Sequence, residues 1–358
     1  MQTGIIGLPQ VGKTSLFRIL TRVHLDAKAA HAPTHVGVAR VADARLDRLA
    51  ELYKPRKTTH ATVEYVDVGG LAKDRAKDSA FLMQLRDVDA LAQVVRVFEN
   101  PVVPHASGTI DPLRDVQNIE LELMLADLEQ ATRRIERMEK DLKKKKDPGL
   151  EHELALLGRC RAAIEAERPL REAEFSAEEH KLLSSFMFLS QKPMLYVLNL
   201  DDDEVAEMDR ALEKHNLGAL ASKTNTTVVP ICGRIEAELA ELEEAEAAEL
   251  LGAYGLKESG LDRLVHATYK LLGLLSFFTC GEAECRAWTI RRGTTAVKAA
   301  GVVHSDFERS FIKAEEVRWD DLLAAGSLAA ARERGRVKLE GKEYVVEDGD
   351  VILFRHGG

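Results

Sequence analysis

The sequence predicts an α/β protein: a doubly wound parallel sheet, interrupted by an antiparallel helical coiled coil and followed by a small C-terminal domain of strands and helices. Three observations lead to this prediction. A glycine-rich loop joins the first apolar run to a helical one, strands and helices then alternate along the chain, and a heptad pattern separates two of the strands. With 358 residues, the chain is long enough for two or three domains.

The composition excludes several classes of protein. A hydrophobic content of 45% with 30% charged residues is typical of a globular protein, and a net charge of −9 argues against a polycation that coats nucleic acid. The first strand begins by residue 3, which leaves no room for a leader, and no apolar run approaches the ~20 residues that span a bilayer. We therefore expect a cytoplasmic protein that does not associate with membranes.

The four cysteines favour a reduced set of thiols. They form no Cys-x-x-Cys pair, and although Cys280 and Cys285 are close in sequence, a zinc site would need two further ligands that the sequence does not offer. We expect neither structural disulfides nor zinc.

The glycine-rich loop matches the phosphate-binding pattern in full, as Gly7-x4-Gly12-Lys13-Thr14. A strand precedes it and a helix follows it, so backbone N–H groups and the helix N-terminus converge on the phosphates. The glycines permit close backbone approach, Lys13 contacts the β- and γ-phosphates, and the Thr14 hydroxyl binds Mg²⁺. The residues expected around the phosphates are Gly7, Gln10, Val11, Gly12, Lys13, Thr14 and Ser15.

The next motif, "EYVDVGGL", places Asp67 at the end of a strand about 50 residues beyond the loop. Asp67 there can hold Mg²⁺ through water, and the Gly70 N–H can bind a γ-phosphate. Leu71 stands where many related enzymes have a glutamine that orients the attacking water. Since Leu71 cannot polarise water, we expect slow intrinsic hydrolysis.

Two later strand ends predict the base site. "KPMLYVLNLDDDE" carries Asn199, Leu200 and Asp202 where GTPase-like folds read the base, and "TTVVPICGR" supplies Cys232 and Gly233 as the turn behind it. These motifs follow the order of a doubly wound sheet that binds its ligand at the carboxyl ends of the strands.

A helical insertion fills the gap between the strands that end near Phe98 and start near Met194. Its heptad positions are Leu121, Leu128, Ile135 and Leu142, with Met124, Ala131 and Met138 three residues after each of the first three. The "KKKKDPG" segment breaks this pattern, and Leu150, Leu154, Leu157 and Ile164 continue it, which predicts an antiparallel hairpin. From residue 133 to residue 146 there are eight Lys or Arg against three acids, so the tip is either a solvated surface or an arm for RNA or the ribosome. The acidic stretch 236–249 is assigned to solubility.

The C-terminal segment changes to short strands and glycine turns from about Ser276. A helix is expected near residues 319–332, and the last two strands, 343–346 and 351–354, are expected to pair as a hairpin around Asp348-Gly349. The predicted boundaries are 1–115 and 190–275 for the nucleotide-binding domain, 116–189 for the inserted helical domain and 276–358 for the C-terminal domain.

Over essentially its whole length the chain resembles the YchF family of Obg-like ATPases. The stretches that carry the resemblance include "GLPQVGKTSLF", "HASGTIDPLRDVQNIELELMLADLEQ", "RAWTIRRGTTAVKAAGVVHSDFERSFIKAE" and "LEGKEYVVEDGDVILFRHG". The resemblance implies that the C-terminal domain is a TGS domain with a ubiquitin-like β-grasp fold. It also implies slow triphosphate hydrolysis with Mg²⁺, a preference for ATP over GTP, and ribosome association, for which Lys143, Lys144, Lys145, Lys146 and the TGS domain are the candidate contacts.

Several positions depart from the family pattern. The family usually has Asn where this chain has Gln10, a position that assists monovalent-cation binding in related proteins, so K⁺ stays open as a second cofactor. The threonine that completes the Mg²⁺ shell in the family aligns with His31, which leaves Thr34, three residues later, as the candidate ligand. The segment after Leu71 is shorter than the family's glycine-rich switch and lacks its glycines.

The base site carries conflicting signals. Asp202 is the acid that, in guanine-binding proteins, accepts from guanine N1–H and the 2-amino group, whereas the family generally has Glu there. Leu200 points the other way, because it replaces the Lys that packs over the base in guanine-specific proteins. Membership of the family favours ATP. The alternatives are a GTP-specific GTPase of the same fold and a nucleotide-binding module with negligible hydrolysis; a metabolic kinase is less favoured because no lid or acceptor segment is visible.

Overall fold

The structure, a computed structural model, describes residues 1–22, 35–68 and 79–357. Its contacts divide the chain into two compact units. The first consists of Met1–Val38 and Glu64–Ala267, and the second of Ala39–Val63 and Thr268–Gly358. The second unit therefore includes a segment, 39–63, that our sequence-based boundaries place in the nucleotide-binding domain.

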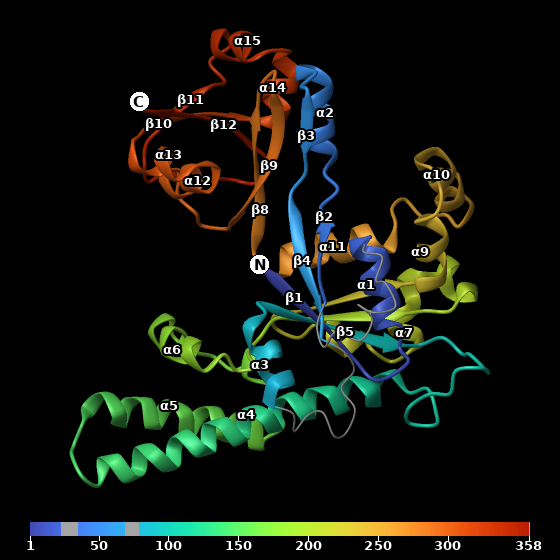
Figure 1. Cartoon of the computed structure of the whole chain (residues 1–358), viewed down its shortest axis with the longest axis vertical. Helices are drawn as coiled ribbons and strands as arrows, with labels where there is room; N and C mark the ends of the chain where they lie inside the picture. The colour runs from blue at the N-terminus through green and yellow to red at the C-terminus, as the bar shows by residue number, and fades with distance from the viewer. Residues whose placement is uncertain (23–34, 69–78, 358) are drawn as a thin grey trace. The chain divides into compact units, whose positions relative to one another are not determined.

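The sheet of the first unit has six strands in the order β2-β4-β1-β5-β6-β7. Within it, β1 runs parallel to both β4 and β5, β5 to β6, and β6 to β7, as predicted for a doubly wound fold (Figure 1). Ile5 and Ile6 point to opposite faces of β1 and both are fully buried, so both faces of the sheet are covered. The strands are β1 (Gln2–Ile6), β2 (His35–Arg40), β4 (Thr62–Asp67), β5 (Ala90–Arg96), β6 (Met194–Asn199) and β7 (Thr226–Ile231).

Helices follow the strands of this unit. They are α1 (Lys13–Thr21), α3 (Ser79–Asp87), α6 (Ala177–Leu183), α7 (Ala211–Lys214), α8 (Gly218–Ala221), α9 (Gly233–Leu239), α10 (Glu244–Ala253) and α11 (Gly260–Leu271), with 3-10 helices η3 (Leu170–Glu172), η4 (Ser184–Phe186) and η5 (Asp202–Arg210). The acidic stretch after Gly233 is thus two helices, and the assignment of all its glutamates to solubility is wrong. Glu236 is buried and accepts from the N–H groups of Gly260 and Leu261, at 2.7 and 3.3 Å, which satisfies the first turn of α11.

The insertion is a helical hairpin of α4 (Pro112–Leu142) and α5 (Pro148–Glu165), as predicted (Figure 1). Met124, Ala131, Ile135 and Met138 pack with Leu156, Leu157, Cys160, Ala163 and Ile164 in its core. Leu121, however, is 45% exposed, because this part of α4 buries Ile119 and Leu123, on either side of it in sequence, in the core of the sheet instead. The heptad register therefore holds only beyond the point where α4 leaves the sheet.

Asp127 fixes the base of the hairpin to the rest of the first unit. Its carboxylate is fully buried and accepts from the backbone N–H groups of Leu189 and Ser190, at 2.9 and 2.7 Å. Arg86 of α3 donates to the same carboxylate at 3.2 Å. These charge-assisted hydrogen bonds hold α4, α3 and the segment before β6 together.

The sheet of the second unit has the order β11-β10-β12-β8-β9-β3. The two central strands, β8 and β12, are parallel to each other, and β9 and β10 pair antiparallel with them on either side. Helix α12 packs its alanines against one face of the sheet. This is the β-grasp arrangement. The elements are β3 (Lys57–Thr59), β8 (Leu274–Cys280), β9 (Glu284–Arg291), β10 (Phe311–Arg318), β11 (Lys338–Glu340), β12 (Asp350–His356), α2 (Ala44–Tyr53), α12 (Ala296–Val303), α13 (Ser305–Arg309), α14 (Trp319–Ala325) and α15 (Leu328–Glu333).

Two local predictions in this unit are wrong. Strand β12 pairs with β10 and β8 rather than with residues 343–346, of which only Val345 makes a bridge, to Thr295. The helix expected over 319–332 is two helices, because Gly326 takes a left-handed conformation (φ +82°) that ends α14.

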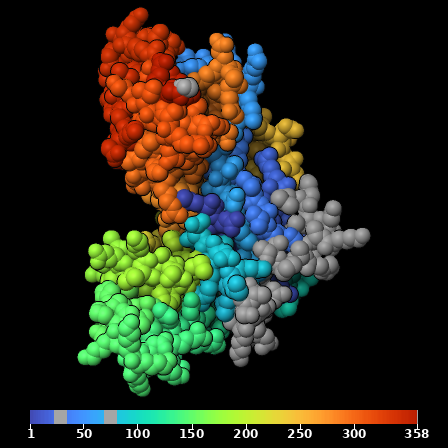
Figure 2. Space-filling model, turned by 60° about the vertical axis from the view of Figure 1, so that its left-hand side comes forward, coloured from blue at the N-terminus to red at the C-terminus, as the bar shows by residue number. Residues whose placement is uncertain are grey.

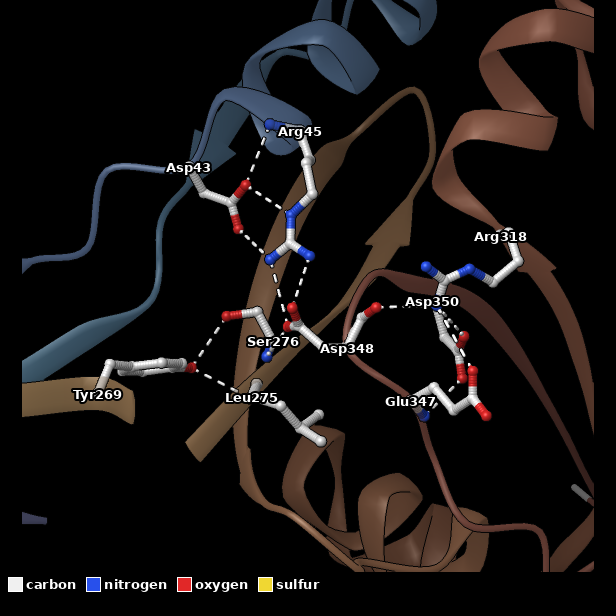
Figure 3. A network of polar contacts seen from close by, with 9 residues as sticks. All are labelled: Asp43, Arg45, Tyr269, Leu275, Ser276, Arg318, Glu347, Asp348 and Asp350. Carbon is white, nitrogen blue, oxygen red and sulfur yellow. Dashed lines mark hydrogen bonds and ion pairs between the residues drawn. The ribbon is translucent and has the colours of Figure 1, made fainter. Parts of the chain in front are cut away.

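The segment 39–63 joins the second unit through strand pairing and an ion-pair network. Its β3 runs parallel to β9, and its blue atoms lie among the orange and red atoms of the C-terminal residues at the top of Figure 2. Arg45 donates to Asp43 and to Asp348, with distances of 2.9 and 2.8 Å for the shorter contacts (Figure 3). Asp348 also accepts from the Ser276 N–H at 2.9 Å, so it links α2 to β8.

Candidate nucleotide-binding site

The glycines of the phosphate loop are required by its backbone. Gly7 has φ +150° and Gly12 has φ +100°. A Cβ at Gly7 would stand 2.6 Å from the Val94 carbonyl oxygen, and one at Gly12 would stand 2.7 Å from the Asn199 side-chain nitrogen. Both positions therefore exclude larger residues for steric as well as conformational reasons.

Gln10 occupies the same loop in a left-handed conformation, with φ +63°, and its side chain is exposed. Asparagine adopts this conformation several-fold more readily than glutamine does. The backbone at residue 10 thus favours Asn, the residue that the family resemblance implies there, over the Gln of this chain.

Lys13 begins α1 and turns back over the loop. Its Nζ donates to the Leu8 carbonyl oxygen at 2.6 Å, and the side chain is buried. Gly12 caps the helix, so the first N–H groups of α1 face the same end as the lysine. Val11 is buried beneath the loop, whereas Thr14 and Ser15 are exposed.

Thr14 and Asp67 come together from α1 and β4. The Thr14 hydroxyl donates to the Asp67 Oδ2 at 3.0 Å, and the carboxylate is buried. A hydroxyl and a carboxylate are the oxygen donors that Mg²⁺ accepts beside water and phosphate, so this pair fits a magnesium ion bound with a nucleotide. Within the described residues no cluster of three or more His, Cys, Asp or Glu side chains could hold a metal by itself. Thr34, Gly70 and Leu71 lie outside the described residues.

Asn199, at the end of β6, connects the phosphate loop to the start of α9. Its Nδ2 donates to the Val11 carbonyl oxygen at 3.1 Å, and its Oδ1 accepts from the Gly233 N–H at 3.0 Å. A Cβ at Gly233 would come within 3.0 Å of the Asn199 Oδ1, so this glycine allows the close approach. The carboxamide thus sets the distance between the phosphate loop and the turn before α9.

Asp202 lies three residues after Asn199, at the start of η5, and is engaged on both oxygens. Arg234, from α9, contacts Oδ2 at 2.6 Å, and the Cys232 thiol donates to Oδ1 at 3.3 Å. The side chain of Asp202 is 31% exposed and that of Arg234 is 83% exposed. Sequence reasoning did not assign Arg234 a role, although its place directly after Gly233 in "CGR" was the available signal.

Two expected base contacts take different places in the structure. Leu200 is 2% exposed and packs in the core with Val205 and Met208, so in this structure its side chain presents no surface to a base. Cys232 is also buried, and burial raises the pKa of its thiol to about 11. The backbone of the turn, with Asp202 and Arg234, forms the accessible part of this end of the site.

The four lysines of the hairpin tip lie together in the turn between α4 and α5. Lys143, Lys144, Lys145 and Lys146 are all exposed, and Lys144 contacts Asp141 at 3.0 Å. Asp147 caps α5 by accepting from the Gly149 and Leu150 N–H groups, so its charge is engaged locally.

In the part of the chain that the structure describes, no helix is long and apolar enough to cross a membrane.

Comparison with known proteins identifies relatives over the full length. Residues 2–129 match the MMR_HSR1 family, described as 50S ribosome-binding GTPase, and residues 274–357 match the YchF-GTPase_C family, described as a protein of unknown function (DUF933). The "Ribosome-binding ATPase YchF" of Bacillus subtilis (strain 168) is 44% identical over 99% of both chains, and that of Escherichia coli O157:H7 is 40% identical over 98% of both. The solved structure of the Schizosaccharomyces pombe YchF GTPase superposes with a TM-score of 0.85 at 31% identity, covering 99% of this chain and 97% of that one.

Proposed function

This chain belongs to the YchF family, and on that premise we propose that it is a nucleoside triphosphatase that hydrolyses ATP slowly and acts as a regulatory switch on the ribosome. The observation that supports this most directly is the phosphate loop, with Lys13 over it and Thr14 joined to Asp67 at its edge. The curated relatives are named ribosome-binding ATPases, which supports both parts of the proposal.

The loop and the start of α1 bind the triphosphate. Their N–H groups surround the phosphates, and the Lys13 ammonium moves from the Leu8 carbonyl to the β- and γ-phosphate oxygens. Thr14 would hold Mg²⁺ directly and Asp67 through water; the ion supplies charge neutralisation on the phosphates. No charged or carboxamide side chain stands at residue 71 to orient water, so hydrolysis depends on this electrostatic stabilisation and is slow.

The contacts of Asp202 support ATP as the substrate. A guanine base would need both oxygens of a free carboxylate, but here Arg234 and Cys232 already engage them. Partial neutralisation by Arg234 also reduces the repulsion between the carboxylate and the lone pair at adenine N1. The GTP-specific alternative requires the Arg234 contact to open when the base binds.

The hairpin tip supports ribosome binding. Four adjacent exposed lysines form a compact positive charge at the end of a helical arm, which suits the phosphates of ribosomal RNA. The C-terminal β-grasp domain is the second contact in this proposal. Because ribosomes work in the cytoplasm, we place the protein there.

The nucleotide part is tested by equilibrium titration of fluorescent ATP and GTP analogues with Mg²⁺, together with phosphate release. We expect ATP to bind more tightly than GTP, and turnover well below the ~10 s⁻¹ median of enzymes. Lys13→Ala should reduce phosphate release to background, whereas Lys257→Ala, an exposed lysine outside the site, should not. Turnover that survives Lys13→Ala would assign the activity to a contaminant. If GTP bound tenfold more tightly than ATP, and Asp202→Glu removed that preference, the ATP assignment would be overturned.

The ribosome part is tested by cosedimentation at several salt concentrations. Replacing all four tip lysines with Gln should weaken binding. The slope of log K against log salt concentration should also become less steep, by up to about three. The matched control replaces Lys181, Arg210, Lys257 and Lys270 with Gln, the same charge change on exposed residues outside the tip. Equal losses in the two variants would remove the tip from the proposal while leaving the nucleotide site untouched.

A further inference from the structure

Two cysteines of the second unit face each other across the β8–β9 hairpin. Cys280 is the last residue of β8, Cys285 is the second residue of β9, and they are direct cross-strand partners. The neighbouring pair toward the turn is closed by the hydrogen bond from the Gly281 N–H to the Glu284 carbonyl oxygen, at 3.1 Å. Hydrogen-bonded and non-hydrogen-bonded pairs alternate along an antiparallel ladder, so the cysteines form a non-hydrogen-bonded pair.

This kind of pair has the spacing that a disulfide needs. Cα atoms of a non-hydrogen-bonded pair are about 4.5 Å apart, and disulfides span Cα separations of about 4.4 to 6.8 Å. Both thiols are free. Because the Cα spacing of such a pair lies within the disulfide range, a bond between them requires no movement of the backbone. No loop closure is required either, because the turn already holds the strands together.

The two thiols share a hydrogen bond that separates their acidities. The hydrogen bond with Cys285, and burial, raise the pKa of Cys280; donation from Cys280 lowers the pKa of Cys285 although burial opposes this. By contrast, burial raises the pKa of the solitary Cys160 and Cys232 thiols to about 11. The pair therefore forms a thiolate more readily than the other two cysteines do.

The pair also lies where the segment 39–63 joins this unit. Thr58 of β3 is the strand partner of Cys285, the Thr59 hydroxyl donates to Glu284 at 2.5 Å, and the Arg56 N–H donates to the Glu282 carbonyl oxygen at 3.0 Å. Burial chiefly raises the pKa of Tyr53 to about 12, and the charges of the two cysteines raise it as well. Tyr53, the last residue of α2, is therefore also close to the pair. Whatever rigidifies this hairpin also rigidifies the attachment of β3.

We propose that Cys280 and Cys285 form a reversible dithiol–disulfide site that reacts with small-molecule disulfides such as glutathione disulfide. The reduced form is the one expected in a reducing cytosol, and the oxidised form appears when the disulfide pool rises. The site lies outside the proposed nucleotide-binding residues. It reacts with a disulfide compound and does not bind a metal or a nucleotide.

The reaction proceeds by thiol–disulfide exchange. The pair first releases one proton to water from Cys285, whose thiolate accepts the hydrogen bond from Cys280. The partly exposed Cys280 sulfur then attacks one sulfur of the glutathione disulfide while its proton passes to Cys285, which acts as the base. One glutathione thiolate leaves and takes up a proton. Cys285 then loses its proton and attacks the Cys280 sulfur, which expels the second glutathione thiolate. In total two protein thiols are oxidised to one disulfide and one glutathione disulfide is reduced to two thiols.

The test uses the full-length protein, reduced, desalted, incubated with glutathione disulfide, alkylated and mapped by mass spectrometry. Trypsin leaves both cysteines in one peptide, residues 271–286. From the oxidised protein this peptide should carry no alkyl group and have a mass about two units below that of the unmodified dithiol peptide. Cleavage after Glu282 and Glu284 separates the cysteines, so the fragments should stay joined until dithiothreitol is added. Amide hydrogen exchange over Lys57–Thr59 should slow in the oxidised protein.

Variants decide between the outcomes. Cys280→Ser and Cys285→Ser should each abolish the bond, and Cys160→Ser, a buried cysteine of the other unit, should leave it intact. If the buried Cys285→Ser fails to fold, Cys280→Ser, at the more exposed position, still tests the site. A stable glutathione adduct on Cys280, or thiols that persist under oxidation, would overturn the proposal. Unchanged exchange over β3 in the oxidised protein would overturn its link to the segment 39–63.

Discussion

Asn199 donates its side-chain N–H to the carbonyl oxygen of Val11, across 3.1 Å between two segments 188 residues apart in sequence. The same carboxamide accepts from the Gly233 N–H. One buried side chain thus positions the phosphate loop relative to the turn before α9. Its contacts are to backbone, so its effect does not depend on which base is bound.

Replacing Asn199 with Ala should weaken the binding of ATP and of GTP alike. Two backbone groups would lose their partner, each buried loss costing about 1–3 kcal/mol, so affinity should fall by at least about tenfold. Titration with fluorescent nucleotides measures this. Asn118→Ala, the same change on an exposed face of α4, should have no effect; a variant at 199 that folds and binds normally would show that the loop needs no such support.

Asp67→Asn should raise the Mg²⁺ concentration that half-maximal hydrolysis requires. The amide oxygen still accepts from Thr14, so the geometry of the loop is kept while the charge that attracts the ion is lost. We expect at least about a tenfold increase, since one unit charge near a bound ion is worth more than ~1.4 kcal/mol at short range. A Mg²⁺ titration of phosphate release, with the exposed Asp209→Asn as control, gives the answer. Identical Mg²⁺ curves would remove Asp67 from the metal site.

Arg234→Ala should shift preference toward GTP. Removing the guanidinium frees an oxygen of Asp202 for guanine and restores the full carboxylate charge near adenine N1. The ion pair is largely exposed, so the shift in the ratio of affinities should be modest, up to about fivefold, corresponding to about 1 kcal/mol. Competition between the two nucleotides measures the ratio directly, and Arg210→Ala controls for loss of positive charge. A shift toward ATP would mean that Arg234 contacts the nucleotide rather than restraining the acid.

Hydrolysis by the wild-type protein should be about equal in K⁺ and Na⁺, whereas Gln10→Asn should gain stimulation by K⁺. The shorter side chain suits both the left-handed backbone at residue 10 and the monovalent-cation role that the family resemblance implies for Asn there. Phosphate-release rates in matched chloride salts test this. Gln191→Asn, a change of the same type outside the loop, should not respond to the cation. Strong K⁺ stimulation of the wild type would show that Gln10 already supports a cation.

Asp348→Asn should destabilise the protein at neutral pH by about 1 kcal/mol, because the carboxylate bound by Arg45 is partly exposed. Burial alone would raise the pKa of Asp348, but hydrogen bonds from Arg45 and the Ser276 N–H outweigh it and lower the pKa below its ordinary value of 3.8. The folded state therefore binds fewer protons than the unfolded state in that range. The stabilisation is complete above about pH 5, where the carboxyl group is ionised in both states, and is lost as the pH falls through the lowered pKa.

Thermal melts of wild type and Asp348→Asn across pH should accordingly converge in acid. Glu343→Gln, at an exposed carboxylate of the same unit, should follow the wild type throughout. A difference between Asp348→Asn and wild type that stayed constant down to pH 2 would assign the loss to packing rather than to charge.

The sequence by itself determined the features whose causes are local. The close backbone approach at the phosphate-loop glycines, the helix that follows them and the buried central strands each follow from a few consecutive residues, so a short motif is enough to predict them. The order of motifs along the chain then placed Asp67 and Asn199 at one end of a parallel sheet. The break between α4 and α5 was equally readable, from "KKKKDPG".

Only the tertiary structure decided which distant segments meet. Segment 39–63 joins the C-terminal domain through Arg45 and Asp348, 303 residues apart, and nothing local distinguishes such a pair from two solvated charges. Strand β12 forms its sheet with β10 and β8 because pairing along both of its edges outweighs the short-range hairpin that Asp348-Gly349 suggests. Likewise, Leu200 lies in the core and Arg234 contacts Asp202, because the rest of the fold determines which side of a strand end faces solvent. Strand register, a property of the assembled sheet, is also what brings Cys280 opposite Cys285.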